Sequence, residues 1–485
     1  MATSLGSAAR SGLISTALTQ ALRVAVQLVS LVALSRMVAP SAFGVFAICL
    51  VVVGLAEAMR ELGLSSAAIQ AGRITEDQQS FLFWLNVAAA TVLSAVTCLL
   101  AAPISWLYGM PELKWLLVAS TVIFIANGAA AQFRARLTRE LRFRAIGLVD
   151  VTSVLLGSLA GIVAASMGAG VWALWLQQAV TFVCSMLGLV CASRWLPAWR
   201  WRVEGRRDLL GVGANFAGIQ VVNYVARNAD TAALGLFASS GTVGQYSRAF
   251  QIISLPISQL NGPATKVAFP VLSRLRDDPA RFQRFHIVGS MALVNTVGSL
   301  LVFIACFSTT LVPFVLGPGW DRAASLAGIL AIAGFSQTVG YGLYWVFLGQ
   351  AWSGANLRYT LWSRGLLLVA VVAAAPSGAT GVAIAFSTVS VLSVPFAMWW
   401  LSTRCGYSIR YFATAVLRSL SVCVAAGLAA VGVSSVSVDG AAATLAVGAA
   451  VYLACISLAI AAIGPYREDF IQLWKIARPT TTAKV

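Results

Sequence analysis

Residues 12–38 read GLISTALTQALRVAVQLVSLVALSRMV, a run of 27 residues with no acidic side chain and only two basic ones, Arg23 and Arg36. About 20 apolar residues in an α-helix cross the ~30 Å hydrocarbon core of a bilayer. The run is therefore long enough to span a membrane. Gln20, Arg23 and Gln27 interrupt it and no small-residue cleavage site follows it, so we interpret it as a first span and not as a removable signal peptide.

The composition of the whole chain extends this interpretation. Of its 485 residues, 59% are hydrophobic and only 10% are charged, whereas a soluble domain carries about 25% charged residues. The mean hydropathy is +0.85. The net charge of +17 could suggest nucleic acid, but the basic residues lie in short loops between apolar runs and not on one solvated face. We therefore expect an integral membrane protein with no nucleic-acid partner.

Apolar runs of membrane-spanning length recur along the entire chain. Their spacing leaves no room for a soluble domain, so the sequence predicts an all-α polytopic membrane protein with about 14 transmembrane helices. The predicted spans are 12–38, 43–69, 80–107, 113–133, 146–167, 170–193, 209–237, 242–270, 287–316, 322–349, 359–375, 378–403, 412–434 and 441–464.

The distribution of basic residues predicts the orientation. With the N-terminus inside, the cytoplasmic segments hold 23 Lys and Arg and the outer loops hold two. Such an asymmetry follows the positive-inside rule. We therefore expect both termini and the loops 134–144, 194–208 and 273–286 to be cytoplasmic.

A shift of 200 residues aligns the chain with itself. Leu34 then matches Leu234, and Gly44 matches Gly244. Six spans of about 35 residues equal this offset, which predicts two six-helix lobes in parallel orientation around a central cleft. The expected division is residues 1–200 for the N-terminal lobe, 201–404 for the C-terminal lobe, and 405–485 for two additional helices and a cytoplasmic tail.

Polar residues form a stripe in each of two spans at the same offset. The first stripe is Thr16, Gln20, Arg23, Gln27 and Ser30, and the second is Gln220, Asn223, Arg227 and Asp230. Spacings of three and four residues put each set on one helix face. A charge at mid-span costs at least ~2.5–3.5 kcal/mol, so we expect both faces to line a water-filled cleft. The alternative is that these side chains only pair between helices.

That structural alternative is favoured for Glu57, Arg60 and Glu61, which lie together on the second span. Arg23 differs from them because no acid lies within one helical turn of it. Arg227 has Asp230 one helical turn away, and this carboxylate can neutralise the charge of Arg227.

Several motifs resemble bacterial oligosaccharide flippases of the polysaccharide-transport family (Wzx-like). They are LSRMVAPSAFGVF at 34–46, ELGLSSAAIQ at 61–70, RNAD at 227–230, GQYSRA at 244–249 and LPISQLNGP at 255–263. The most similar branch contains exporters of colanic acid and other exopolysaccharides. The wider superfamily also holds multidrug exporters and peptidoglycan-precursor flippases, which use alternating access.

The resemblance implies translocation of an oligosaccharide on undecaprenyl pyrophosphate across the bacterial inner membrane, for exopolysaccharide or lipopolysaccharide biosynthesis. Membrane lipids would surround the protein, and a polysaccharide polymerase and export machinery are candidate partners. An anionic diphosphate needs cationic donors, and sugars need hydrogen-bonding groups. The candidate cations are Arg23, Arg227, Arg248, Lys266 and Arg364, and the candidate polar ligands are Gln20, Gln27, Gln220 and Asn223. Asp230 is the candidate for ion coupling.

Two other functions remain open at this point. A multidrug exporter of the same superfamily would favour cations, yet the acids counted within the spans, Glu57, Glu61 and Asp230, are outnumbered by eight bases. A membrane polysaccharide polymerase or glycosyltransferase would need catalytic acids in a large loop. The chain has no DxD and no GxxxxGK[ST] motif, so we expect a transporter and not an enzyme.

The cysteines and the single histidine suggest no further chemistry. The eight cysteines include no CxxC pair, and seven of them lie inside apolar runs. We therefore expect no disulfide framework, metal site or cofactor. His286 adjoins a basic loop, and we expect it to be a solvated loop residue.

Overall fold

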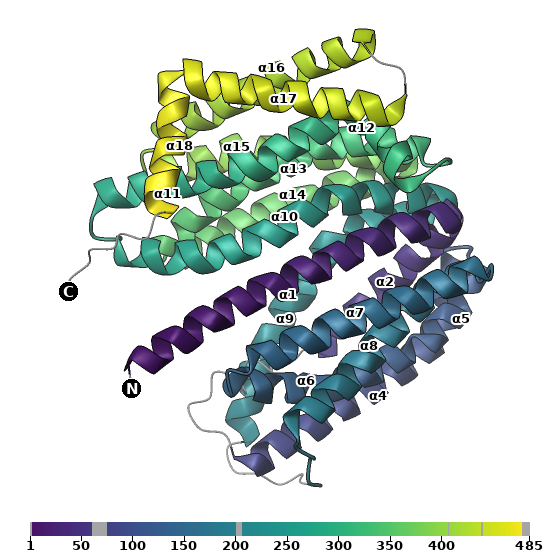
Figure 1. Ribbon diagram of the computed structural model, residues 1–485. Coiled ribbons are helices and arrows are strands. Elements are labelled where there is room, and N and C mark those ends of the chain that lie inside the picture. The colour runs from purple at the N-terminus through teal and green to yellow at the C-terminus, as the bar shows by residue number, and fades with distance from the viewer. Residues whose placement is uncertain (1, 61–74, 200–205, 406, 438–439, 478–485) are drawn as a thin grey trace. The chain divides into compact units, whose positions relative to one another are not determined.

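The computed structural model describes residues 2–60, 75–199, 206–405, 407–437 and 440–477, and all of its regular elements there are helices (Figure 1). The motif at 61–70, Glu61, the expected lobe boundary at residues 200/201 and the end of the tail lie outside the described residues, as do the side chains of Arg60 and Gln220. Two compact units make up the chain, unit 1 being Met1–Gly244 and unit 2 Gln245–Val485. The expected division into six-helix lobes stays a prediction.

Unit 1 is a bundle of long helices. Helix α7 packs along α8 and α1, α4 packs against α6, and α2 packs against α9. The bounds are α1 (Ala2–Met37), α2 (Pro40–Arg60), α4 (Glu76–Leu107), α5 (Pro111–Ala119), α6 (Thr121–Arg139), α7 (Phe143–Ser166), α8 (Val171–Ser193) and α9 (Arg206–Phe237).

Local sequence explains where several of these helices begin. At α4, the Thr75 hydroxyl accepts the Gln78 backbone N–H, and the Gln78 side chain accepts the Thr75 N–H. This reciprocal pair is a capping box, and it satisfies two backbone donors that a helix start leaves unpaired. Helices α2 and α5 begin at Pro40 and Pro111, where proline loses no intrahelical hydrogen bond.

Unit 2 is built around α13, whose residues are buried along most of its length. Helices α12 and α15 flank α13, and α16 and α17 cover α12 (Figure 1). The bounds are α10 (Ser240–Arg274), α11 (Pro279–Leu293), a π-helical turn (Val294–Gly298), α12 (Ser299–Leu316), α13 (Asp321–Gly349), α14 (Ser353–Ala374), α15 (Gly378–Cys405), α16 (Arg410–Ser437), α17 (Ala441–Ala462) and α18 (Gly464–Ala477). The first residues of α10, up to Gly244, belong to unit 1.

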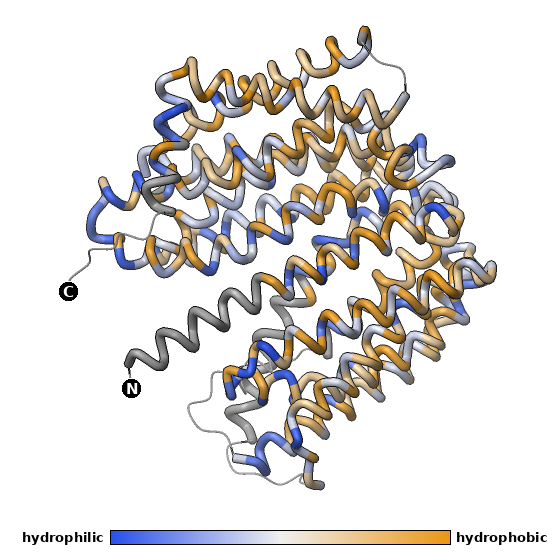
Figure 2. Tube along the Cα trace, in the orientation of Figure 1, coloured by the Kyte–Doolittle hydropathy of each residue, from blue (hydrophilic) through white to orange (hydrophobic). Residues whose placement is uncertain are grey.

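The expectation of an all-α polytopic membrane protein is confirmed. Eleven stretches of the described residues are long and apolar enough to cross a membrane, and Figure 2 shows their apolar residues along the helices of both units. One of these stretches, Ser353–Thr403, covers α14 and most of α15. Helices α9 and α10 are not among the eleven; α9 carries the second polar stripe, and α10 carries Arg248 and Lys266.

The expectation for His286 is wrong. Its side chain is 0% exposed in α11, where Nε2 lies 2.9 Å from the Gly342 carbonyl oxygen and Nδ1 lies 3.0 Å from the Tyr407 hydroxyl. A carbonyl can only accept, so Nε2 carries a proton, and in the neutral ring Nδ1 accepts the Tyr407 O–H. Helix α11 begins at Pro279, inside the loop predicted at 273–286, so His286 lies about two turns into the helix and on its buried face.

Candidate functional site

Two arginines of unit 1 share one carboxylate. Arg134, near the end of α6, places Nη1 3.1 Å from Oδ2 and Nη2 2.5 Å from Oδ1 of Asp150 on α7. Arg23, on α1, places Nη1 4.0 Å from the same Oδ2. Three helices therefore bring two guanidinium groups and one carboxylate together, and we call this set the Asp150 cluster.

The Asp150 cluster has a net charge of +1, because two guanidinium groups surround one carboxylate. The Arg23 and Arg134 side chains are 40% and 41% exposed, whereas Asp150 is 21% exposed. Both guanidinium groups thus keep N–H donors available to an anion that approaches from the open side. The geometry is suited to a phosphate or carboxylate that would share the arginines with Asp150.

Sequence reasoning missed two members of this cluster. Asp150 lies inside the predicted span 146–167 and belongs with the membrane acids, and Arg134 lies at the edge of a loop expected to be cytoplasmic. The acid within reach of Arg23 comes from another helix, so spacing along α1 could not reveal it. A complete count of acids within the spans would have identified Asp150.

The rest of the first polar stripe has mixed surroundings. Gln20 is exposed and Gln27 is half-buried. Ser30 is buried and accepts a 2.8 Å hydrogen bond from Nε2 of Gln177 on α8, so this end of the stripe joins helices. Arg23 lies 14 residues before the end of α1 at Met37, which is about 21 Å along the axis.

The second stripe lies on α9. Asn223 and Arg227 are exposed, whereas Asp230 is only 4% exposed and accepts the Thr231 backbone N–H at 2.7 Å. Helix α9 is held to α2 by the Tyr224 hydroxyl, which donates to the Leu50 carbonyl at 3.0 Å. Glu57 on α2 accepts a hydrogen bond from Asn127, which agrees with the structural interpretation of that acid.

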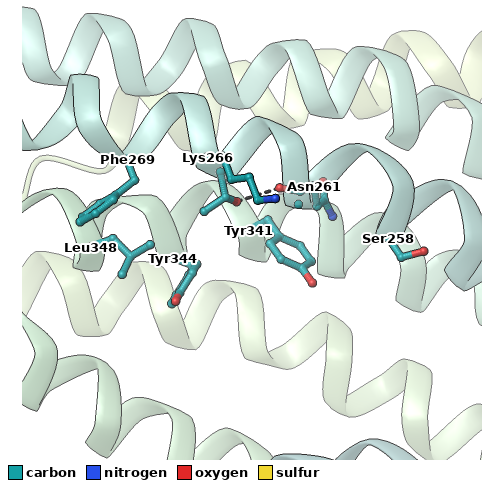
Figure 3. Close-up of a pocket in the computed structure, with 9 residues that line it drawn as sticks. Ser258, Asn261, Lys266, Phe269, Tyr341, Tyr344 and Leu348 are labelled. Carbon is teal, nitrogen blue, oxygen red and sulfur yellow. Dashed lines mark hydrogen bonds between the residues drawn. The ribbon is translucent and has the colours of Figure 1, made fainter. Parts of the chain in front are cut away.

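Unit 2 contains the remaining candidate cations. Arg248 is half-buried and donates to Gln251 one turn later on α10. Arg364 is exposed on α14. Lys266 is exposed on α10 and lines a hollow of about 460 Å³ between α10 and α13 (Figure 3).

No metal-binding arrangement stands out in the described part of the chain, where no three His, Cys, Asp or Glu side chains gather closely enough to hold an ion. The seven cysteines with described side chains are free thiols.

The fold defines the class of protein. The structure superposes on that of the lipid II flippase MurJ in an inward closed conformation with a TM-score of 0.72 and 15% identity, covering 95% of this chain and 99% of that one. It also matches an inward-facing MATE-family multidrug resistance transporter of the MOP superfamily, with a TM-score of 0.55 and 15% identity over 80% of this chain and 96% of that one. These likenesses establish the flippase and MATE fold.

The family follows from the sequence. Residues 33–325 match the polysaccharide biosynthesis protein family, and the chain belongs to it. The lipopolysaccharide biosynthesis protein WzxC of Escherichia coli is 24% identical over 76% of this chain and 75% of its own length. The teichuronic acid biosynthesis protein TuaB of Bacillus subtilis is also 24% identical, over 78% and 79% of the two chains. The expected family is confirmed.

Proposed function

We propose that this protein is a flippase that moves undecaprenyl-pyrophosphate-linked oligosaccharide across the bacterial inner membrane by alternating access. The cargo would serve exopolysaccharide or lipopolysaccharide biosynthesis. Membership of the polysaccharide biosynthesis family carries this proposal. It is supported by relatives named for lipopolysaccharide biosynthesis in Escherichia coli and for succinoglycan biosynthesis transport in Rhizobium meliloti.

The Asp150 cluster offers a physical basis for handling such a cargo. A pyrophosphate esterified at both ends carries two negative charges and cannot cross hydrocarbon unaided, so a flippase needs donors that replace its hydration. Arg23 and Arg134 expose guanidinium forks that match phosphate oxygens, and Asp150 holds them in place when no cargo is bound. The expected ligands of the cargo's sugars are the amides Gln20, Gln27 and Asn223.

The topology and the lobes belong to the same proposal. Both termini would lie in the cytoplasm, and residues 1–200 and 201–404 would rock about a central site, with 405–485 as an appendage. Arg227, Arg248, Lys266, Arg364 and Gln220 would line that site with Arg23. Asp230 would couple transport to a proton or cation, and a polymerase would receive the cargo outside.

The test is complementation of a strain that lacks this gene. The wild-type chain should restore surface polysaccharide and clear the lipid-linked repeat that accumulates on the inner leaflet. Rescue of polymer together with persistent accumulation of the lipid-linked repeat would contradict the proposal, as would a complete failure of well-expressed protein to rescue.

A multidrug exporter is the second candidate, because the MATE transporter shares the fold. The same bacterial strains test the multidrug function. If expression raises resistance to ethidium and related organic cations without changing surface polysaccharide, the multidrug function replaces the flippase. We expect resistance to stay unchanged, since the exposed charges of the Asp150 cluster repel cations.

A further inference from the structure

The hollow between α10 and α13 has the dimensions of a small-molecule site. Its volume is about 460 Å³, within the range of roughly 300–1,000 Å³ that such sites occupy. Helix α10 lines it with residues at 258, 261/262, 265/266 and 269, a repeat of three to four residues that includes Asn261 and Lys266, and α13 adds Tyr341 and Tyr344 (Figure 3). This spacing turns one face of each helix toward the hollow.

Asn261 is the most informative residue of the hollow. Its side chain is 1% exposed, and neither Oδ1 nor Nδ2 has a hydrogen-bond partner among the described residues. A buried amide without partners destabilises a fold, so its presence calls for an explanation. The neighbouring Thr265 hydroxyl donates its one proton to the Asn261 backbone carbonyl at 2.8 Å and accepts the Trp345 indole N–H at 2.8 Å, so it has no proton left for Asn261 Oδ1.

The other walls supply an unpaired charge and two aromatic rings. Lys266 is exposed and forms no ion pair with any acid in the described ranges. Tyr341 and Tyr344 are exposed, at 36% and 37%, and their rings project in the same direction from α13 (Figure 3). Their faces can cover an apolar surface while their hydroxyls stay available for hydrogen bonds.

We propose that this hollow binds one sugar ring of the cargo, and that this ring carries a carboxylate. The proposal rests on the flippase function and names the part of the cargo that unit 2 recognises. Asn261 would donate to one ring hydroxyl and accept from another, the tyrosines would cover the C–H face of the ring, and Lys266 would pair with the carboxylate.

The donor set favours a sugar over the pyrophosphate that was expected to engage Lys266. An ionised phosphate only accepts hydrogen bonds, so it would leave Asn261 Oδ1 buried without a donor. A sugar hydroxyl can satisfy Oδ1 and Nδ2 alike. Aromatic walls add contact area for a ring but nothing for a diphosphate.

Three variants separate the roles within the hollow. Gly262→Leu fills it without removing a polar group, because a Cβ at Gly262 would meet no atom within 4 Å. Asn261→Leu removes the buried amide, and Lys266→Gln removes the charge. Gly432→Leu is the matched control, since a Cβ there also meets open space and Gly432 lies on α16, away from the hollow.

The binding experiment uses the full-length protein in phosphatidylcholine nanodiscs. Methyl β-D-glucuronide, methyl β-D-glucoside and inorganic pyrophosphate are titrated separately, with saturation-transfer difference NMR for the glycosides and calorimetry for pyrophosphate. We expect the wild type and Gly432→Leu to prefer the glucuronide over the glucoside roughly fivefold. Lys266→Gln should abolish this preference, and Gly262→Leu should abolish binding of both glycosides.

Asn261→Leu provides a readout that a structural asparagine would not give. It should weaken both glycosides while thermal stability stays equal or rises, because an unpartnered amide is removed from the interior. A fall in melting temperature with unchanged glycoside binding would overturn the proposal. Glycoside binding that survives Gly262→Leu would overturn it as well.

Two outcomes assign the hollow to another ligand. Pyrophosphate binding that depends on Lys266 but not on Asn261 would return Lys266 to headgroup recognition. Displacement of a bound glucuronide by phosphatidylglycerol nanodiscs, dependent on Lys266, would make the hollow a lipid site. The flippase function is tested separately from the sugar site. If the wild type does not complement, the flippase function is contradicted. If the wild type complements and all three variants export normally, the flippase function stands and only the sugar site is contradicted.

Discussion

Arg23 and Arg134 both contact Asp150, but the contact made by Arg134 is closer than the one made by Arg23. Arg134 contacts both carboxylate oxygens, whereas Arg23 reaches one of them at 4.0 Å. Removing Arg23 therefore leaves Asp150 paired. We expect Arg23→Ala and Arg23→Gln to lose polymer export, and Arg23→Lys to retain part of it. One charge-assisted contact accounts for roughly 1.5–3 kcal/mol of binding, about 10- to 150-fold.

The double variant Arg23→Ala/Asp150→Asn decides between cargo binding and structural pairing. If Arg23 binds cargo, neutralising Asp150 cannot restore export. If Arg23 only balances Asp150, the double variant should export better than Arg23→Ala alone. Complementation at matched membrane levels measures both, and full export by Arg23→Ala would remove the charged-site mechanism.

Asp230 is buried and accepts a backbone N–H, and Asn can retain that hydrogen bond through its carbonyl oxygen. If the carboxylate couples transport to an ion, Asp230→Asn should slow transport and make it insensitive to a proton or sodium gradient. Transport assays in proteoliposomes with and without each gradient measure this. The exposed Asp321, changed to Asn, is the control. Unchanged ion dependence in Asp230→Asn would return the residue to a structural role.

The hydrogen bond between Tyr407 and the buried His286 should contribute to the stability of the protein. Tyr407 donates to Nδ1 of His286, and burial raises the pKa of the Tyr407 hydroxyl, so this group stays protonated as a donor. Tyr407→Phe leaves Nδ1 unpaired and should cost about 1–3 kcal/mol of stability. Thermal unfolding in detergent measures the loss. Tyr411→Phe, on a side chain that is 67% exposed, should change the melting temperature little.

At the residue scale, the sequence identifies polar groups but not their partners. The stripe containing Gln20, Arg23 and Gln27 was evident from spacing, whereas the pairing with Asp150 depends on how α1, α6 and α7 pack. Likewise, no sequence pattern shows that the Asn261 amide lacks a partner, because that absence is a property of the packed helices around it.

Helix α2 and the start of α10 meet within unit 1 at two glycines. A Cβ on Gly44 would lie 1.7 Å from the Ser240 carbonyl oxygen, and a Cβ on Gly244 would lie 1.8 Å from that of Pro40. We therefore expect Gly44→Ala and Gly244→Ala each to cost about 1–3 kcal/mol or more, because the backbones must separate. Gly241→Ala, which meets only one side-chain atom at 4.0 Å, should be tolerated.

Fluorescence-detected size-exclusion chromatography after a heat step compares these three variants. A melting temperature of Gly44→Ala equal to that of Gly241→Ala would show that the helices do not approach this closely in the membrane.

At the element scale, the length of the apolar runs predicted the helices well, because the thickness of the hydrocarbon core sets the length of a membrane-spanning helix. It could not predict interruptions. Ser120 separates α5 from α6, and the π-helical turn Val294–Gly298 separates α11 from α12, both inside continuous apolar runs. Helix α18 is too polar to be a span, and it is held by contacts such as Tyr466 donating to Asn295 at 3.0 Å. These features arise from packing between helices.

The whole molecule should have an inside and an outside that labelling can distinguish. We expect single cysteines at the exposed positions Arg142, Ala198 and Asp277 to resist membrane-impermeant maleimide in intact cells. A cysteine in place of Met167, which is 80% exposed in a loop expected on the outer side, should react with the maleimide. The native thiols are replaced first, because Cys98 and Cys191 are exposed. Labelling of all three inner positions would invert or overturn the topology.

The contact between Gly44 and Gly244 joins two positions that the 200-residue offset makes equivalent. Each glycine presents its own backbone to the other: the position of a Cβ on Gly44 lies 2.9 Å from the Gly244 nitrogen, and that of a Cβ on Gly244 lies 3.0 Å from the Gly44 nitrogen. Main chain has no alternative rotamers, so neither side of the contact can give way as a flexible side chain would. The cost of adding a side chain at one glycine therefore falls on the helix that carries the other.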